Sequence, residues 1–360
     1  MAIVEAALAS VLTLWGVLAL HVRAPLGRHV SRVFIGLLVL SATLFVTTRL
    51  FDSPMRVAGA GLFALAVTPL LAWWCTLRPS NARDWLPEVS RLLSSVREGR
   101  IVTLHNVRHF AWYGTGLDDD CIERWETRRY DLDRLCSVDL LLSSWGRPAI
   151  AHVMVSFGFA DGRHLAFSVE IRRKRGDRFS ELGGFFRQYE RCIVAADEDD
   201  IVKVRTNLRG EEGELFRVKM TPTARVSLLE AYLEEANRLR DRPRFYNTLT
   251  ANCTTLVFQM ARRIVPGLPL DYRLLATGYL PDYLARIGAL SGTHDMATYR
   301  RLGRFTERAR ASRPDLSHDL SHDPSHDLSP DPSRSFSRDI RRGVPGVADG
   351  SDETALALPR

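Results

Sequence analysis

Residues 149–172, AIAHVMVSFGFADGRHLAFSVEIR, decide the fold of the central part of this chain. Two runs rich in branched and aromatic side chains, 149–159 and 164–172, flank the tripeptide at 160–162, Ala-Asp-Gly. Such composition on both sides of a short Asp- and Gly-containing turn is typical of a β-hairpin. We therefore predict two antiparallel strands, placed within a larger α+β domain.

His152 opens the first of these strands and is a candidate catalytic base. A three-residue loop pairs Phe159 with Arg163 and places His152 opposite Glu170, whereas a two-residue loop places Ile171 there. In the first register a carboxylate lies beside the imidazole and can fix its tautomer, as the third member of a catalytic triad does. The alternative for His152 is a half-buried histidine satisfied by its neighbours.

Other polar residues of the hairpin have competing interpretations. Glu170 is compatible with an ordinary strand-end salt bridge to Arg172. His164 competes with Glu170 as a third catalytic member, or is an exposed residue beside the turn. The basic run at 172–175 is typical of a solvated face, and Arg172 is also our candidate for binding an anionic substrate.

The tetrapeptide Asn252-Cys253-Thr254-Thr255 supplies the candidate nucleophile. Asn252 is a predicted N-cap, and Cys253 begins an apolar helical pattern that runs to residue 264. The free N–H groups and dipole of a helix N-terminus favour a thiolate, and a nearby imidazole completes its activation. The alternative is a small buried residue without chemistry.

Further elements complete an α/β or α+β domain over residues 79–291. Thr221 and Pro222 open a second clear helix that extends to Leu239. Strands are predicted from the patterns at the following positions: 100–107, 139–144, and one or two strands within 193–204.

Three apolar segments precede this domain, at residues 6–20, 33–48 and 57–77. The third contains no charge and ends near Trp73 and Trp74, which suit a membrane interface. The first lacks the basic start and the cleavage site of a signal peptide. We predict a three-helix, multi-pass membrane anchor over residues 1–78.

The charges of the connecting loops bear on orientation. The first loop is more basic than the second, which places it, and with three spans everything after residue 77, in the cytoplasm. The residues concerned are Arg23, Arg28 and Arg32 in the first loop, and Arg49, Arg56 and Asp52 in the second.

The C-terminal part changes composition. Residues 312–340 repeat S-H-D-L or S-H-D-P among prolines and arginines, so we predict a low-complexity, disordered tail over 292–360. Histidines recur there every four residues, at His318, His322 and His326. Repeat expansion in a solvated tail is favoured over a metal site.

Composition narrows the function classes. Of 360 residues, 46% are hydrophobic and 25% charged, with a net charge of +7. The arginines are scattered among acids rather than gathered with aromatics, which argues against a nucleic-acid partner. Five cysteines include no C-x-x-C pair, which argues against zinc, while Cys121 and Cys136 could form a disulfide in an oxidising compartment.

Several motifs, in order, resemble the Lnb-type N-terminal periplasmic domain family, which includes lipoprotein N-acyltransferases. The resemblance covers residues 78–265. Its histidine strand precedes its cysteine helix, as in the circularly permuted papain-like arrangement of NlpC/P60 and lecithin:retinol acyltransferase relatives. The motifs are RPSNARDW, VTLHNVRHF, WETRRYDL, VDLLLSSWG, AHVMVSFGFADGRHLAFSVEIRR, FRQYE, VRTNLRGE and FYNTLTANCTT.

The resemblance implies a thiol acyltransferase without metal, nucleotide or other cofactor. Cys253, helped by His152, would take an acyl chain from a membrane phospholipid and pass it to the N-terminal amine of a lipoprotein. Glu170 would orient His152. Asn252, Thr254 and backbone N–H groups at the helix start, including that of Cys253, would support the oxyanion.

The resemblance also implies a periplasmic domain on the bacterial inner membrane. We prefer this location to the loop-charge prediction because long domains translocate largely regardless of charge. Two alternatives in function remain open. One is a papain-like amidase or peptidase of the cell envelope, and the other is a non-catalytic membrane scaffold, in which Cys253 lies beyond hydrogen-bond reach of His152.

Overall fold

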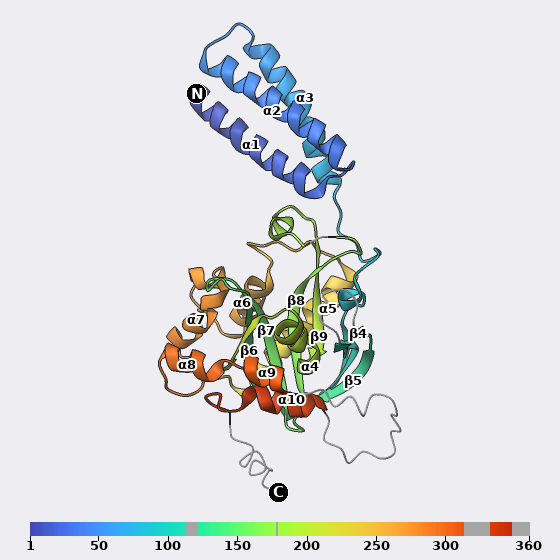
Figure 1. Cartoon of the computed structure of the whole chain (residues 1–360), viewed down its shortest axis with the longest axis vertical. Coiled ribbons are helices and arrows are strands. Elements are labelled where there is room, and N and C mark those ends of the chain that lie inside the picture. The colour runs from blue at the N-terminus through green and yellow to red at the C-terminus, as the bar shows by residue number, and fades with distance from the viewer. Residues whose placement is uncertain (113–120, 178, 313–331, 348–360) are drawn as a thin grey trace. The chain divides into compact units, whose positions relative to one another are not determined.

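The computed structural model describes residues 1–112, 121–177, 179–312 and 332–347 (Figure 1). The chain divides into two compact units. The first comprises Met1–Arg83, Arg173–Glu190 and Pro243–Thr248, and the second comprises Asp84–Arg172, Arg191–Arg242 and Leu249–Arg360.

The first unit contains three long apolar helices, α1 (Ala2–Arg23), α2 (Arg28–Leu50) and α3 (Arg56–Thr76). Within the described residues, these three are long and apolar enough to cross a membrane. Gly16 of α1 allows close packing, because a Cβ there would lie 2.6 Å from Leu70 and 2.9 Å from Leu38. The three predicted apolar segments therefore correspond to three packed helices of a membrane protein.

The second unit is built on a mixed sheet. Its described strands follow the order β1-β2-β9-β8-β7-β6-β10, and β5 pairs with β2 outside this path. A separate two-stranded sheet joins β3 to β4. The bounds are β1 Ser94–Glu98, β2 Ile101–Arg108, β3 Ala111–Trp112, β4 Cys121–Ile122, β5 Trp125–Asp131, β6 Leu135–Ser144, β7 Ala151–Phe159, β8 His164–Arg172, β9 Glu190–Asp197 and β10 Glu212–Arg217.

Helices cover both faces of this sheet (Figure 1). Side chains of α5 and α6 pack on one face, and side chains of α4, α9 and α10 pack on the other. Double coverage explains why β7 is buried at eight of its nine positions, since both of its faces are covered. The bounds are α4 Glu198–Ile201, α5 Pro222–Asp241, α6 Cys253–Ile264, α7 Leu280–Arg286, α8 Met296–Gly303, α9 Thr306–Ala311 and α10 Pro332–Arg341.

Short helical turns connect these elements. The 3₁₀ turns are η1 Pro87–Val89, η2 Leu132–Arg134, η3 Glu181–Phe185, η5 Tyr272–Leu274 and η6 Thr277–Tyr279, and the π-helical turn is η4 Val204–Leu208.

The β7–β8 hairpin has the predicted three-residue loop. The Phe159 N–H donates to the Arg163 carbonyl at 2.9 Å, and Gly162 takes the positive φ of 82° that the turn requires. The paired register runs from Gly158↔His164 to Met154↔Ser168. Continued by two residues, this register places His152 opposite Glu170, as predicted.

Of the one or two strands predicted within residues 193–204, the structure has one. Strand β9 ends at Asp197, and the chain continues as α4 and then as the π-helical turn Val204–Leu208. Three acidic residues, Glu198, Asp199 and Asp200, occupy the first turn of α4. Negative charge at a helix N-terminus is stabilising, so these residues favour a helix over a second strand.

The predicted disorder of residues 292–360 is wrong where the structure describes them. Helices α8, α9 and α10 pack on the sheet domain, and Phe336, Ile340 and Val344 of the last segment are almost fully buried. Phe336 and Ile340 are spaced by four on one apolar face of α10, and Val344 follows shortly after the helix ends. The repeat that contains His318, His322 and His326 lies outside the described residues.

Candidate active site

Helix α6 begins with a fixed geometry that places Cys253 at its first position. The Asn252 side chain accepts the N–H groups of Thr254 at 2.9 Å and Thr255 at 2.7 Å. In return, the Asn252 N–H donates to the Thr255 hydroxyl at 3.0 Å, which completes a capping box. The predicted N-cap is confirmed, and the cap holds the Cys253 thiol in the field of the helix N-terminus.

The Cys253 thiol contacts the N-terminal end of strand β7, beyond the last paired residues of β7 and β8. Its sulfur is hydrogen-bonded to His152 and to the backbone N–H of Val153. Alternate residues of a strand direct their N–H groups to the same side, and the Phe159 N–H points to β8. The Val153 N–H therefore also points toward β8, but the paired register of β7 and β8 ends at Met154, and this N–H donates to the sulfur instead.

These contacts lower the pKa of the Cys253 thiol and raise the pKa of His152. Burial alone would raise the pKa of the Cys253 thiol, but the hydrogen bond and charge of His152 and the Val153 N–H lower it. Burial and Arg205 would lower the pKa of His152, yet Glu170 and the bond to Cys253 raise it to about 9. The favoured state is a thiolate–imidazolium pair, which is the reactive form of a catalytic cysteine.

The other side of the imidazole is fixed by two β8 residues. The Nε2 atom of His152 lies 2.6 Å from the Ser168 hydroxyl and 3.2 Å from Glu170 Oε1. The Ser168 hydroxyl in turn donates to Glu170 Oε1 at 2.7 Å. Because Nε2 is engaged in this way, Nδ1 is the ring nitrogen left to face the thiol.

Glu170 is itself anchored from outside the hairpin. Arg205 Nη2 donates to Glu170 Oε1 at 2.9 Å, while Nη1 of the same arginine lies 3.4 Å from Glu211. The Ser143 hydroxyl donates to Glu211. Burial would raise the pKa of Glu170, but the charges of His152 and Arg205 hold it well below its ordinary value. Glu170 is therefore an anion that orients the histidine.

Ser168 and Arg205 were not singled out from the sequence. Ser168 lies two residues from Glu170, hence on the same strand face, and the register alone would have identified it. Arg205 belongs to the VRTNLRGE motif, but its approach to Glu170 depends on a π-helical turn that no sequence pattern indicated.

Asn252 and Thr254 were predicted to support the oxyanion. Their capping contacts instead stabilise the start of helix α6. The Thr254 N–H donates to the Asn252 side-chain oxygen Oδ1, so both groups are engaged in the cap. The Thr254 hydroxyl lies 3.9 Å from the Cys253 sulfur and contributes to lowering its pKa. Of the predicted oxyanion donors, the Cys253 N–H is the one closest to the reacting sulfur.

His164 is not part of this constellation, which corrects its interpretation as a third member. It pairs with Gly158, six residues from His152 along β7, or roughly 20 Å at the rise of a strand. Its Nδ1 lies 3.2 Å from the Gly162 carbonyl, and burial lowers its pKa to about 4. His164 is therefore a neutral, structural histidine at neutral pH.

Arg172 has a structural position that argues against the predicted substrate binding. Its guanidinium donates to the Val89 carbonyl at 2.8 Å and to the Ser90 carbonyl at 2.7 Å. It also lies 4.3 Å from the Trp85 ring centroid, and the residue is buried. These contacts tie η1 to the end of β8.

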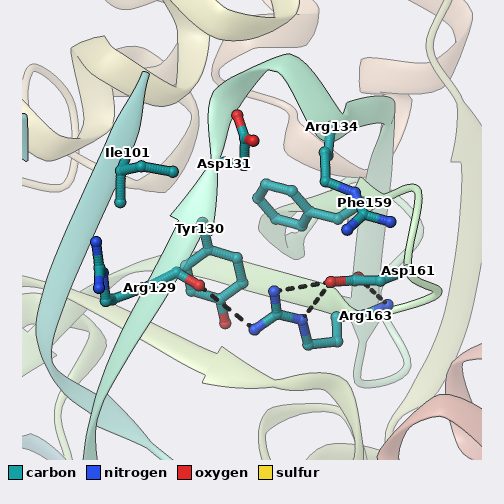
Figure 2. Close-up of a pocket in the computed structure, with 8 residues that line it drawn as sticks. All are labelled: Ile101, Arg129, Tyr130, Asp131, Arg134, Phe159, Asp161 and Arg163. Atoms are coloured by element: carbon teal, nitrogen blue, oxygen red, sulfur yellow. Dashed lines mark hydrogen bonds and ion pairs between the residues drawn. The ribbon is translucent and has the colours of Figure 1, made fainter. Parts of the chain in front are cut away.

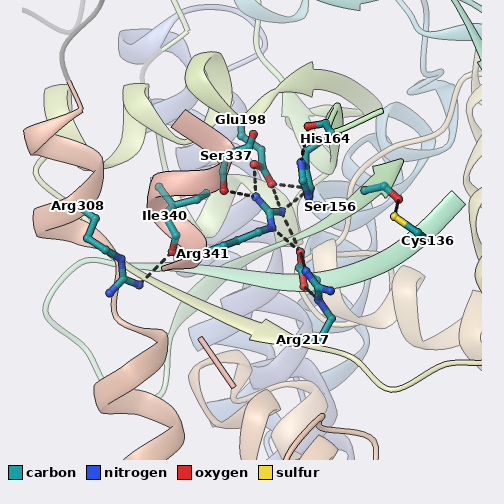
Figure 3. A network of polar contacts seen from close by, with 12 residues as sticks. Cys136, Ser156, His164, Glu198, Arg217, Arg308, Ser337, Ile340 and Arg341 are labelled. Carbon is teal, nitrogen blue, oxygen red and sulfur yellow. Dashed lines mark hydrogen bonds and ion pairs between the residues drawn. The ribbon is translucent and has the colours of Figure 1, made fainter. Parts of the chain in front are cut away.

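A second buried charge cluster centres on Arg341 of α10 (Figure 3). Both carboxylate oxygens of Glu198 accept from Arg341 at 2.6 Å, and Asp139 accepts at 2.9 Å. Ser156 donates to Glu198 at 2.6 Å, and Arg217 is paired with Asp139. Burial would raise the pKa of Glu198, but Arg341 lowers it to about 2.

Among the residues that the structure describes, one group of side chains has metal-ligand character. It consists of His109, Asp197 and Asp199, whose ligand atoms lie within 4.8 Å of one another. It suits a cation poorly, because Arg128 already holds Asp197 by two bonds of 2.6 Å. In addition, the pKa of His109 is raised to about 9, because the hydrogen bond and charge of Asp197 outweigh the lowering effect of burial. Cys121 and Cys136, the candidate disulfide pair, are not joined by a disulfide.

A pocket of about 290 Å³ lies at the turn end of the hairpin (Figure 2). Arg163 spans it, ion-paired with Asp161 at 2.8 Å and placed 4.6 Å from the Tyr130 ring centroid. The pocket lies at the end of β7 away from His152, and three arginines and two aspartates contribute to its lining. It is not part of the Cys253 site.

The chain is thus a membrane protein whose α+β domain carries a cysteine–histidine pair, in which Cys253 is buried and His152 is partly buried. Residues 122–278 match the family model described as the Lnb N-terminal periplasmic domain, which confirms the resemblance predicted from the sequence. This range contains Cys253, His152 and Glu170, and it ends before α10 and Arg341. No curated protein and no solved structure matches the chain.

Proposed function

We propose that this protein is a thiol acyltransferase of the bacterial inner membrane. The observation that carries the proposal is the Cys253–His152 hydrogen bond at the start of α6, with Glu170 fixing the imidazole. The order of the histidine strand and the cysteine helix supports a permuted papain-like, NlpC/P60-like site. The scaffold alternative expected these two side chains out of reach of each other, and their hydrogen bond argues against it.

In the first half-reaction the Cys253 thiolate attacks the carbonyl carbon of a phospholipid ester. The new C–S bond produces a tetrahedral oxyanion, for which the Cys253 N–H is the nearest helix-start donor. The His152 imidazolium then gives its proton to the departing glycerol oxygen as the C–O bond breaks. The products are a Cys253 thioester, a lysophospholipid and neutral His152.

In the second half-reaction the neutral α-amine of a lipoprotein attacks the thioester carbonyl. His152 takes the proton that the amine loses, and the C–S bond breaks to return the thiolate. Glu170 stabilises the imidazolium at both stages because it remains ionised. In the amidase or peptidase alternative, the thiolate attacks a peptide amide of the cell envelope, His152 protonates the departing amine, and water then hydrolyses the thioester.

The description of the matched family supports the proposed periplasmic location of the domain. A periplasmic domain after three spans requires a cytoplasmic N-terminus, against the charge bias of the first loop. A fusion of alkaline phosphatase after residue 347 tests this orientation, because that enzyme is active only outside the cytoplasm. An active fusion supports the proposal, whereas an inactive, expressed fusion contradicts it.

The activity is tested in cells that lack other lipoprotein N-acyltransferases. The full chain should convert lipoprotein N-termini to an acylated form detected by mass spectrometry, and Cys253→Ala should abolish the conversion. Cys192→Ala is the matched control, because Cys192 is buried behind β8 with a pKa that burial raises to about 12. Unchanged lipoprotein N-termini with the wild-type chain would contradict the proposed acceptor.

A further inference from the structure

The segment Arg173–Glu190 clusters with the three apolar helices rather than with the sheet domain. Its Arg187 donates to the Trp74 carbonyl at 3.2 Å and lies 4.7 Å from the Trp74 ring centroid. Arg23 of α1 donates to the Arg187 carbonyl. Arg23 and Trp74 are near the C-terminal ends of α1 and α3, which run in the same direction, so the segment lies at one membrane surface.

Within this segment, η3 presents an apolar side outward. Its Gly183 and Gly184 are buried: a Cβ at Gly183 would lie 2.3 Å from Gln188, and a Cβ at Gly184 would lie 2.3 Å from Thr248. Because the glycine side is packed inward, the other side chains are directed away. Leu182 is 46% exposed and Phe185 38%, and the preceding Phe179 is 59% exposed.

Three large apolar side chains within seven residues are costly in water, and together they mark an interaction surface. The start of the same segment is basic, with Arg173, Lys174 and Arg175 in succession. Apolar side chains beside basic ones are typical of segments that lie in the interface of an anionic membrane. Trp73 and Trp74 mark the same level on α3.

We propose that Arg173–Glu190 is an interfacial anchor that inserts Phe179, Leu182 and Phe185 into the surface of an anionic phospholipid bilayer. The occupant is the bilayer because the surface continues from helices that themselves cross a membrane, and its charge is complementary to anionic headgroups. The segment follows Glu170 by three residues in the chain, which links lipid contact to the active-site hairpin. That link alone rests on the proposed function.

The test uses the full chain with Cys253→Ala, reconstituted in nanodiscs, so that no outcome depends on catalysis. A photoreactive benzophenone amino acid replaces Phe179, Leu182 or Phe185 one at a time, and lipid adducts are measured by mass spectrometry. Leu14, 61% exposed on α1, is the positive control, and Val96, 53% exposed on β1, is the matched negative control.

We expect about tenfold more lipid adduct at the three anchor positions than at Val96, as for side chains buried in the interface. Replacing Arg173, Lys174 and Arg175 by glutamine should reduce the preference for anionic over zwitterionic lipid by about fivefold for each charge. Labelling of lipid at Leu14 but not at any anchor position would overturn the proposal. Adducts at the anchor in a chain without acyltransfer would uphold it while removing the proposed function.

Discussion

The cluster around His152 and the cluster around Arg341 both include a residue on the same face of β7. They differ in whether a proton can be transferred within the cluster. His152 belongs to the first cluster and Ser156 to the second, and the two residues are four positions apart along the strand, or roughly 13 Å. Around Arg341 each carboxylate is paired with an arginine, and the one histidine nearby is held neutral. Around His152 a proton is shared with Cys253, so charge can be redistributed within the pair.

The difference shows that burial of charge does not by itself indicate catalysis. Both clusters contain strongly shifted carboxylates, Glu170 and Glu198, and both are closed by an arginine from a distant segment. Only the first includes a nucleophile whose pKa is lowered and a base whose pKa is raised. Such opposed shifts are the signature of an acid–base pair.

The largest expected effect separates the two histidines. His152→Ala should reduce acyl transfer by roughly 10³-fold, the usual contribution of a general acid–base residue. His164→Ala should leave the rate within about threefold, because this ring belongs to the structural cluster. Rates are compared on equal amounts of folded protein. Equal losses in both variants would remove the distinction between the clusters.

The next effect concerns stability. Arg341→Met should lower the free energy of unfolding by about 3–5 kcal/mol, because Asp139 and Glu198 are left buried and unpaired. Arg342→Met is the matched control, since Arg342 is the next residue, 73% exposed and paired with Asp339. Urea unfolding of the detergent-solubilised chain measures both. A loss under 1 kcal/mol for Arg341→Met would show that the cluster opens to water.

A change at Glu170 should be intermediate. Glu170→Gln removes the charge that favours the imidazolium, so acyl transfer should fall by about tenfold to hundredfold. Glu211→Gln, which acts one contact further from the histidine through Arg205, should have a smaller effect. Steady-state rates of the two variants measure both losses. A larger loss in Glu211→Gln than in Glu170→Gln would contradict the assignment of Glu170 as the orienting carboxylate.

The pH dependence gives a readout that needs no substrate. The thiolate–imidazolium pair forms as pH rises through the lowered pKa of Cys253, below its ordinary 9.0, and loses its imidazolium as pH passes about 9. Alkylation of Cys253 by iodoacetamide should therefore already be fast below pH 9. In Glu170→Gln the imidazolium loses its stabilising charge and favours the thiolate less, so the rise in alkylation rate should move to higher pH. An unshifted profile in His152→Ala would exclude the ion pair.

The smallest effect is expected at Ser168. Ser168→Ala removes one hydrogen bond to Nε2 but leaves Glu170 within 3.2 Å, so the loss should be about 1 kcal/mol, or about fivefold in rate. Ser168→Thr keeps the hydroxyl and should restore most of the rate. A failure of threonine to restore it would indicate that packing, rather than the hydroxyl, is needed.

Local sequence patterns predicted the parts of the site that depend on neighbours in the chain. The turn at 160–162 determined the hairpin register, and with it the pairing of His152 and Glu170. The capping sequence determined the start of α6 and the position of Cys253. These features follow from strand alternation and helix capping, which act over a few residues.

The contacts that arrive from distant segments could not be predicted in this way. Arg205 reaches Glu170 through a π-helical turn, and Arg341 reaches Glu198 from a segment whose composition suggested disorder. Arg172 was assigned to substrate because its neighbours are basic, but Trp85 and η1 cover it. Tertiary packing decides which arginines are buried, and single-sequence composition does not report it.

The backbone N–H of Val153 has a consequence for measurement. It donates to sulfur instead of to the neighbouring strand, so its exchange with solvent deuterium depends on what the sulfur carries. A thiolate is a strong acceptor and should slow the exchange, whereas an acylated sulfur accepts weakly and should release the amide. Exchange at this single amide therefore distinguishes the free thiolate from the proposed acylated form of Cys253, without a label on either proposed substrate.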